Sequence, residues 1–296
     1  MEKNNDINND AEKVSLAYKT KAIINKYGFT FKKNFGQNFL VDERVLEKIA
    51  DAADITDEDI VLEVGPGIGT LTAALAKRAK KVIAVEIDKT LIPILEETLA
   101  DYDNIEIINE DILKVDLVGI SEKYGRKLKV AANLPYYITT PIIMDILEKG
   151  LPIESMTVMI QKEVAYRMQA APDTKDYGSL SLMVQYYSKA YLAANVPRNC
   201  FMPRPNVDSA VIRLTLYDKP PVEVKEPEFF FKFIKAAFSM RRKTLVNCIY
   251  NSFRGGMSKE ELEEILSENG YDEKIRGEKL SIEDFARLSD VFCEVL

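Results

Sequence analysis

Length, composition and charge limit the functions open to this chain. Its 296 residues, 47% of them hydrophobic, can bury a full core and exceed the usual single-domain size of about 100 to 200 residues. The absence of histidine excludes Ser-His and Cys-His nucleophilic schemes, imidazole metal sites and the usual base at neutral pH. No apolar run reaches the roughly 18 residues that span a bilayer, and residues 1–10 contain no secretory-type apolar segment. We therefore expect a cytoplasmic protein with one large and one small domain, no metal site and no membrane contact.

The net charge of −7 is unevenly distributed along the chain. Residues 257–296 contain 12 acidic and five basic side chains, so the negative excess lies at the C-terminal end. Residues 13–41 contain no acidic residue, and six lysines are interspersed there with aromatic side chains. Such a segment is typical of nucleic-acid binding, although a solvated arm would have the same composition. Lys32 and Lys33 are the candidate phosphate contacts in this arm.

Strand-like and helix-like segments alternate through the first two thirds of the chain. Residues 1–12 are rich in Asn and Asp and are expected to be disordered. An amphipathic helix is predicted to start near Asp42. Strands are then predicted at 60–64, 81–86, 105–109, 128–132 and 156–161, and helices at 70–78, 90–100 and 141–148. This alternation predicts a doubly wound, mostly parallel α/β sheet.

The pattern changes after residue 178. Residues 179–187 fit either a helix or a strand, and the alternation over 208–216 predicts an edge strand of a hairpin. Lys219-Pro220-Pro221 is typical of a linker. Helix-start signals follow at Pro227, at Ser258 with Glu261, and at Ser281. We therefore predict a sheet domain over residues 13–218 and a small all-helical domain over residues 219–296.

A glycine-rich turn joins the first predicted strand of the alternating segment to its helix. The run Glu63-Val64-Gly65-Pro66-Gly67-Ile68-Gly69-Thr70 has the spacing GxGxG, and Thr70 stands where an NAD fingerprint requires glycine. Glycines such as Gly65 and Gly67 let the backbone approach a ligand, and the helix beyond offers free N–H groups. The spacing resembles motif I of the S-adenosylmethionine-dependent methyltransferases. The alternative interpretation is an ordinary tight turn that binds no ligand.

Two acidic residues follow the next two strands. Glu86 ends one strand, where a carboxylate can accept hydrogen bonds from both ribose hydroxyls. Asp111 lies just past the next, where it can accept from an adenine amino group. Either acid alone is typical of a solvated strand end. Together they favour a ligand site, because ligands in open sheets bind at the carboxyl ends of strands.

Asn133-Leu134-Pro135-Tyr136 follows the apolar strand predicted at 128–132. It resembles motif IV of the amino-methyltransferases. An adenine N6 lone pair is delocalised into the ring, so the amine needs acceptors for its two N–H groups before it can attack. The resemblance implies that the Asn133 side-chain carbonyl and the Leu134 backbone carbonyl accept these bonds, that Pro135 fixes the turn and that Tyr136 stacks on the base. Positioning then supplies most of the acceleration.

A third stretch, Phe201-Met202-Pro203-Arg204-Pro205-Asn206-Val207-Asp208-Ser209, completes a wider pattern that also includes Gly36-Gln37-Asn38-Phe39-Leu40. With the two motifs above, it resembles the ribosomal RNA adenine N6-dimethyltransferases, and among them the small-subunit (16S) type. The resemblance implies a seven-stranded Rossmann-like methyltransferase sheet. It also implies an S-adenosylmethionine pocket lined by Asn38, Leu40, Gly65, Gly67, Glu86, Asp111 and Asn133. Phe201 would hold a flipped base beside Tyr136.

The implied substrate is a pair of adjacent adenines in the 3′-terminal hairpin loop of 16S rRNA, within an immature small subunit. Arg198 and Arg204 flank Phe201 and are candidate RNA contacts. Arg241-Arg242-Lys243, on a predicted helix, is a third candidate, although a solvated helix face would look the same. Tyr137 departs from a common form of the family, which has Asn there. We expect this difference to affect how the base enters and not catalysis.

Two alternatives stay open from the residues alone. One is a 23S rRNA adenine methyltransferase of the macrolide-resistance type, which shares the pocket motifs. Leu134 in place of Ile and the run that begins at Phe201 favour the small-subunit type. The other is a ribosome-assembly checkpoint factor, for which binding to the subunit matters more than methylation. We expect a monomer, because no exposed apolar stripe indicates a partner helix.

Overall fold

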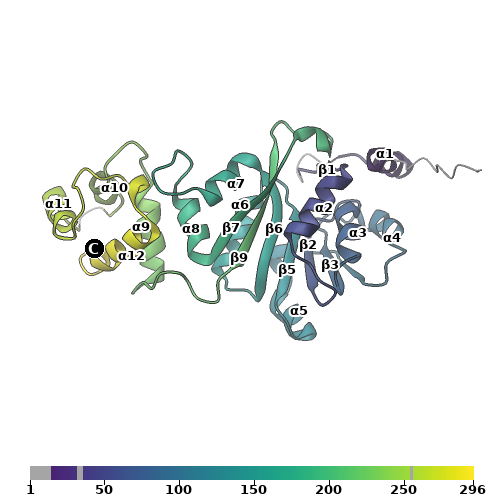
Figure 1. The fold of residues 1–296 in the computed structure, drawn as a ribbon, viewed down its shortest axis with the longest axis horizontal. Helices are drawn as coiled ribbons and strands as arrows, with labels where there is room; N and C mark the ends of the chain where they lie inside the picture. Colours follow the sequence, from purple (N-terminus) through teal and green to yellow (C-terminus); the bar gives the residue numbers. More distant parts are fainter. Residues whose placement is uncertain (1–14, 32–35, 254–255) are drawn as a thin grey trace, which may run out of the picture.

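The computed structural model describes residues 15–31, 36–253 and 256–296 of the chain. A central sheet flanked by helices continues at one end into a helical region formed by the C-terminal residues (Figure 1). The expected disorder of residues 1–12 lies outside the described residues, as do Lys32 and Lys33. Among the described residues, no helix combines the length and apolar character needed to cross a membrane.

A seven-stranded sheet forms the centre of the molecule, with the order β4-β3-β2-β5-β6-β9-β7. Strands β2 to β6 are parallel, whereas β9 runs antiparallel to both β6 and β7. This mixed sheet confirms the predicted fold class. The strands are β2 (Ile60–Val64), β3 (Lys81–Val85), β4 (Ile105–Ile108), β5 (Leu128–Asn133), β6 (Ile153–Gln161), β7 (Ser188–Val196) and β9 (Ser209–Leu216).

Helices cover both faces of this sheet, which explains why its central strands are almost continuously apolar. Along β2, Leu62 packs into one hydrophobic cluster and Val61 into another on the opposite face. The Leu62 side is covered by α5 (Leu117–Tyr124), α6 (Thr139–Glu148), α7 (Lys162–Gln169) and α8 (Ser179–Tyr187). The Val61 side is covered by α2 (Glu43–Ala52) and α3 (Thr70–Ala76). Helix α4 (Ile92–Thr98) packs in a smaller cluster with Ile68 and Phe39.

The segment at 208–216 is not an edge strand, contrary to the prediction. Strand β9 lies between β6 and β7, and both Val211 and Ile212 on its two faces are fully buried. The alternation of the sequence was misleading because helices bury both faces of β9, and the unpredicted strand β7 pairs along the edge that would otherwise be free. Strand β7 takes the edge position itself, with Tyr191 exposed. The ambiguous segment at 179–187 is helix α8.

The basic arm contains a helix, α1 (Leu16–Lys26), which the sequence pattern did not predict. Lys26 forms an ion pair with Glu97, 2.5 Å between Nζ and Oε1, that ties the end of this helix to α4. Phe29 and Phe31 pack against Phe39, with ring centroids 5.7 and 5.3 Å from it. These two aromatic rings therefore serve a small core and do not form an exposed surface for stacking on bases.

Four helices form the C-terminal end of the chain: α9 (Pro227–Ala237), α10 (Leu245–Ser252), α11 (Lys259–Glu268) and α12 (Ile282–Cys293). Their core combines four buried phenylalanines with leucines, isoleucines and alanines, and α8 and the loop before it contribute Tyr186 and Tyr177. The capping boxes begun by Ser258 and Ser281 are present as predicted. The division into domains at residue 218 stays a prediction.

Arg241-Arg242-Lys243 does not lie on a helix, contrary to the prediction. The triplet lies in the turn between α9 and α10. Helix α10 begins only after Thr244, whose hydroxyl accepts a hydrogen bond from the backbone N–H of Asn247. This cap requires an extended residue at position 244, so the triplet before it turns away from the helix axis.

A two-stranded antiparallel sheet joins segments that are far apart in the sequence. Strand β1 (Phe39–Leu40) pairs with β8 (Phe201–Met202), with Leu40 opposite Phe201. The backbone N–H of Val41 extends this contact by donating to the carbonyl of Cys200 at 2.8 Å. The pairing fixes residues 36–40 across the carboxyl ends of the parallel strands.

Candidate active site

A pocket opens at the carboxyl ends of β2, β3 and β5, beneath residues 36–40. The space among its lining residues is about 1050 Å³, counting the part open to solvent. Every residue proposed from sequence for the cofactor lines this pocket: Asn38, Leu40, Gly65, Gly67, Glu86, Asp111 and Asn133. Leu134, Pro135 and Tyr136 line it as well.

The glycine turn after β2 leaves room for a ligand. Gly65 and Gly67 have φ values of 70° and 62°, in the left-handed region that favours glycine. A Cβ on Gly67 would lie 3.0 Å from the Phe39 ring, so that position also requires glycine on steric grounds. A Cβ on Gly65 would meet nothing within 4 Å. The space beside Gly65 is therefore open to a ligand, and the residues present fit the implied cofactor.

Glu86 connects the end of β3 to the glycine turn. Its Oε2 accepts from the backbone N–H of Gly67 at 3.3 Å, and its Oε1 accepts from that of Asp88 at 2.8 Å. Burial raises the pKa of this carboxyl, and the two backbone donors offset part of the rise. Asp111 lies at the next strand end and accepts from the backbone N–H of Leu113 at 3.1 Å. Both acids are thus oriented by backbone groups on the pocket wall.

Glu63 is a pocket residue that sequence analysis did not assign. Its side chain is only 1% exposed at the end of β2, and its Oε2 has no hydrogen-bond partner among the described residues. Burial raises its pKa to about 8, the Thr72 hydroxyl opposes this rise, and the nearby charge of Glu86 adds to it. The available signal was an acidic residue inside the apolar run Ile60–Val64. Such a buried, unpartnered oxygen on the pocket wall also fits a site that holds a polar ligand.

The Asn133 side chain is oriented by the segment that covers the pocket. Its Nδ2 donates to the carbonyl of Asn38 at 2.9 Å, which fixes Oδ1 as the free acceptor of the amide. The Leu134 backbone N–H donates to the carbonyl of Met159 at 3.1 Å and so continues the pairing with β6. Within the described part of the chain, neither Oδ1 of Asn133 nor the carbonyl of Leu134 accepts a hydrogen bond. The site therefore holds two acceptors on adjacent residues.

Tyr136 and Phe201 differ in their access to the pocket. The Tyr136 hydroxyl lies 2.7 Å from Oγ of Ser209 at the start of β9, and burial raises its pKa. Phe201 is only 5% exposed and packs in a hydrophobic cluster with Leu40 and Cys200. It is not among the residues that line the pocket. The structure thus brings Tyr136 to the site and leaves Phe201 behind its wall.

The predicted basic residues that the structure describes lie at two surfaces outside the pocket. Arg198 and Arg204 are exposed, and the backbone N–H of Arg198 donates to Asp208. Arg241 and Lys243 line a hollow between the helical end and the loop before α8. This hollow, called here the helical-end groove, also holds three further basic residues: Arg167, Lys175 and Arg276. Its acidic residues are Glu163, Asp176 and Glu278.

Comparison with known proteins agrees with the geometry of this pocket. Residues 28–293 match the family described as ribosomal RNA adenine dimethylase. The chain belongs to that family. It is accordingly an S-adenosylmethionine-dependent rRNA adenine N6-dimethyltransferase, which confirms the predicted enzyme class and cofactor.

Relatives of high identity extend over nearly the whole chain. The ribosomal RNA small subunit methyltransferase A of Lachnoclostridium phytofermentans is 59% identical over 92% of this chain and 95% of its own. Its namesake from Bacillus licheniformis is 52% identical over 96% of this chain and 98% of its own.

Two solved structures resemble the chain to similar degrees. A dimethyladenosine transferase from Plasmodium falciparum has a TM-score of 0.72 and 27% identity, covering 86% of this chain and 96% of that one. The 23S rRNA methyltransferase ErmE has a TM-score of 0.66 and 29% identity, covering 85% and 98%. The fold therefore does not separate a dimethyladenosine transferase from a 23S rRNA methyltransferase, whereas both sequence relatives above are small-subunit methyltransferases.

Proposed function

We propose that this chain methylates N6 of two adjacent adenines in the 3′-terminal hairpin loop of 16S rRNA, twice each. The observation that carries the proposal is the pair of adjacent acceptors, Asn133 Oδ1 and the Leu134 carbonyl, on the wall of the pocket. The identity of 52–59% with small-subunit methyltransferases over nearly the full chain supports the choice of rRNA. We also propose that the modification takes place during small-subunit maturation and that the protein acts as a cytoplasmic monomer.

The two acceptors explain how a weak nucleophile becomes reactive. Hydrogen bonds from the adenine amino group to Asn133 and Leu134 would orient the N6 lone pair toward the methyl donor. S-adenosylmethionine supplies, when bound, an electrophilic methyl group on its sulfonium centre. The methylated amine loses its extra proton readily, so the residues of the site need not include a strong base. A chain without histidine is compatible with this chemistry.

The other pocket residues hold the cofactor and the base in this proposal. Glu86 would accept the ribose hydroxyls, and Asp111 would accept from the adenine amino group of the cofactor. Tyr136 would stack on the target base, because its ring is anchored through the 2.7 Å contact between its hydroxyl and Ser209. We assign Phe201 a positioning role, since it is buried behind Leu40 and fixes the register of β1 and β8.

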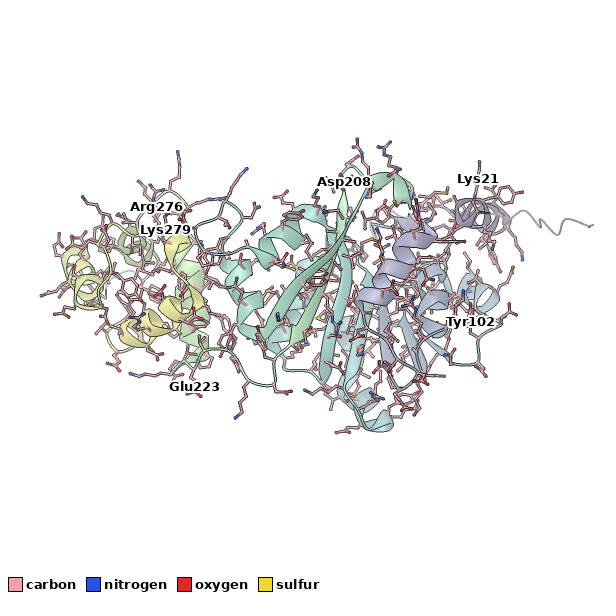
Figure 2. All side chains as sticks on the ribbon, in the orientation of Figure 1. Lys21, Tyr102, Asp208, Glu223, Arg276 and Lys279 are labelled. Carbon is pink, nitrogen blue, oxygen red and sulfur yellow. The ribbon has the colours of Figure 1, made fainter. Side chains whose placement is uncertain are left out.

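The helical-end groove is our proposed path for the RNA backbone. Figure 2 draws Arg276, which lines this groove, on the same side of the molecule as Asp208 at the start of β9, with Glu223 on the opposite side. Phosphates along this side would meet Arg241 and Lys243 before the loop nucleotide reaches Arg198 and Arg204. The target adenine must leave its stack to be methylated, which costs least in a loop.

The decisive experiment maps the modified adenines. Primer extension across 16S and 23S rRNA, from a strain lacking this protein, should lose the two adjacent stops near the 3′ end of 16S rRNA only. Loss of a 23S stop instead would establish the large-subunit alternative. An Asn133→Ala strain tests the checkpoint alternative. If the folded, inactive protein still permits normal subunit maturation, methylation is not the essential step.

A further inference from the structure

Tyr137 stands directly after the motif that the sequence associates with the target base. It follows Tyr136 in the turn between β5 and α6, yet the two side chains have different partners. Tyr136 contacts Ser209 through its hydroxyl, at the edge of the pocket next to β9. Tyr137 is 57% exposed and also lines the pocket. The sequence associates Tyr137 with entry of the base. Its contacts decide whether it lies beside the base or beside the cofactor.

The Tyr137 ring lies against the segment that covers the pocket. A Cβ on Gly36 would lie 3.3 Å from Cδ1 and 3.6 Å from Cε1 of this ring. The same Cβ would lie 3.5 Å from Cβ of Pro135. Gly36 has a φ of 56°, so its backbone already favours glycine, and the ring makes the position crowded as well. Tyr137 thus spans the gap between residues 36–40 and the turn after β5.

The acidic end of the pocket influences the Tyr137 hydroxyl. Burial raises the pKa of this phenol, and the charges of Asp111 and Glu86 raise it further. These are the two acids proposed to hold the adenosine part of the cofactor, at the ends of β3 and β4. The pKa of Tyr136, in contrast, is raised by burial, lowered by the contact with Ser209 and raised by the charge of Asp208. The pKa values of the adjacent tyrosines are therefore influenced by different acids.

We infer that Tyr137 is a positioning residue for the adenosine half of S-adenosylmethionine, covering the mouth of the pocket between Gly36 and the two acids. The inference rests on the proposed function of the pocket and adds a cofactor contact to it. Tyr137 is more than half exposed, and its exposed surface is available to a flat, partly apolar ligand such as a nucleoside. Tyr137 then acts on cofactor affinity and leaves base entry to Tyr136.

The test measures cofactor-product binding in the absence of RNA. Isothermal titration of S-adenosylhomocysteine into Tyr137→Ala should give a Kd raised about three- to tenfold, the range expected for one aromatic contact. Adenosine should lose affinity by the same factor, because the lost contact is to the adenosine half. Tyr137→Phe should retain most of the affinity. Tyr191→Ala, an equally exposed tyrosine on β7, is the matched control and should bind like the wild type.

Steady-state kinetics and a second variant keep the result interpretable. Tyr137→Ala should raise KM for S-adenosylmethionine while kcat and KM for the RNA substrate stay within about twofold. Unchanged S-adenosylhomocysteine affinity with a raised KM for RNA would overturn the inference and return Tyr137 to base entry. Tyr137→Asn replaces the Ala variant if the latter unfolds. Glu86→Ala tests whether the pocket holds the cofactor at all. Unchanged S-adenosylhomocysteine affinity in this variant would refute the proposed function and not only the role of Tyr137.

Discussion

The two ends of the pocket are built from different kinds of contact. At the cofactor end, Gly67 and Glu86 are tied together by a backbone N–H and a carboxylate, within one stretch of consecutive strands. At the base end, Asn133 depends on the carbonyl of Asn38, and Tyr136 on Ser209, through contacts that cross 95 and 73 residues of sequence. Changes at the cofactor end should therefore alter binding and stability, whereas changes at the base end should alter the methyl-transfer rate.

The largest expected effect concerns Glu63 at the cofactor end. Its carboxyl stays protonated in the folded state up to about pH 8, while the unfolded chain releases the proton near its ordinary pKa of 4.5. The unfolded state therefore binds fewer protons between these values, and the free energy of unfolding falls as pH rises, by up to about 1.4 kcal/mol per pH unit. Glu63→Gln cannot titrate and should lose this dependence.

Urea denaturation of the wild type and Glu63→Gln at pH 5 and pH 8 checks this expectation. The two proteins should have similar stability at pH 5, and the variant should be the more stable at pH 8 by up to about 4 kcal/mol. Glu110→Gln, an exposed acid on the same pocket wall, is the control and should behave like the wild type. Equal pH dependence in all three proteins would contradict a neutral Glu63.

The next effect concerns Asn133 at the base end. Asn133→Ala removes one of the two acceptors, so the rate of methyl transfer should fall about 100- to 1000-fold, as when one preorganised hydrogen-bonding group is lost from an active site. Its affinity for S-adenosylhomocysteine should change by less than about tenfold. Single-turnover transfer of labelled methyl groups to immature small subunits, with calorimetry, measures both quantities. A loss confined to cofactor binding would show that Asn133 belongs to the cofactor end. Asn195→Ala on β7 controls for a lost surface amide.

The smallest effect separates the Tyr136 ring from its hydroxyl. Tyr136→Ala should lower kcat/KM for the RNA about 10- to 100-fold, because stacking on a base is worth about 1–3 kcal/mol. Tyr136→Phe keeps the ring and should cost only about two- to tenfold, the value of one hydrogen bond. Ser209→Ala should match the Phe variant, and the double variant should add nothing further. Additive losses in the double variant would mean that the 2.7 Å contact does not anchor the ring.

The residues that line the proposed cofactor end could be named almost completely from sequence. Gly65, Gly67, Glu86 and Asp111 follow consecutive parallel strands, and the carboxyl ends of such strands meet at one edge of a sheet. Local backbone rules therefore sufficed to bring these residues together. Sequence reasoning missed Glu63, since its protonation depends on burial beside Thr72 of α3 and between the strands β3 and β5.

The tertiary structure alone decided how the pocket is covered and what surrounds it. Pairing of Leu40 with Phe201 joins segments about 160 residues apart and buries the ring that sequence analysis had placed against the base. Long-range contacts also decide that β9 is buried between two strands. They likewise decide that Arg241-Arg242-Lys243 lies in a turn. The sequence by itself determined the parallel sheet, the glycine turn and the polar strand ends, because these follow from local periodicity. Long-range pairing and packing determined which of the remaining side chains reach the site.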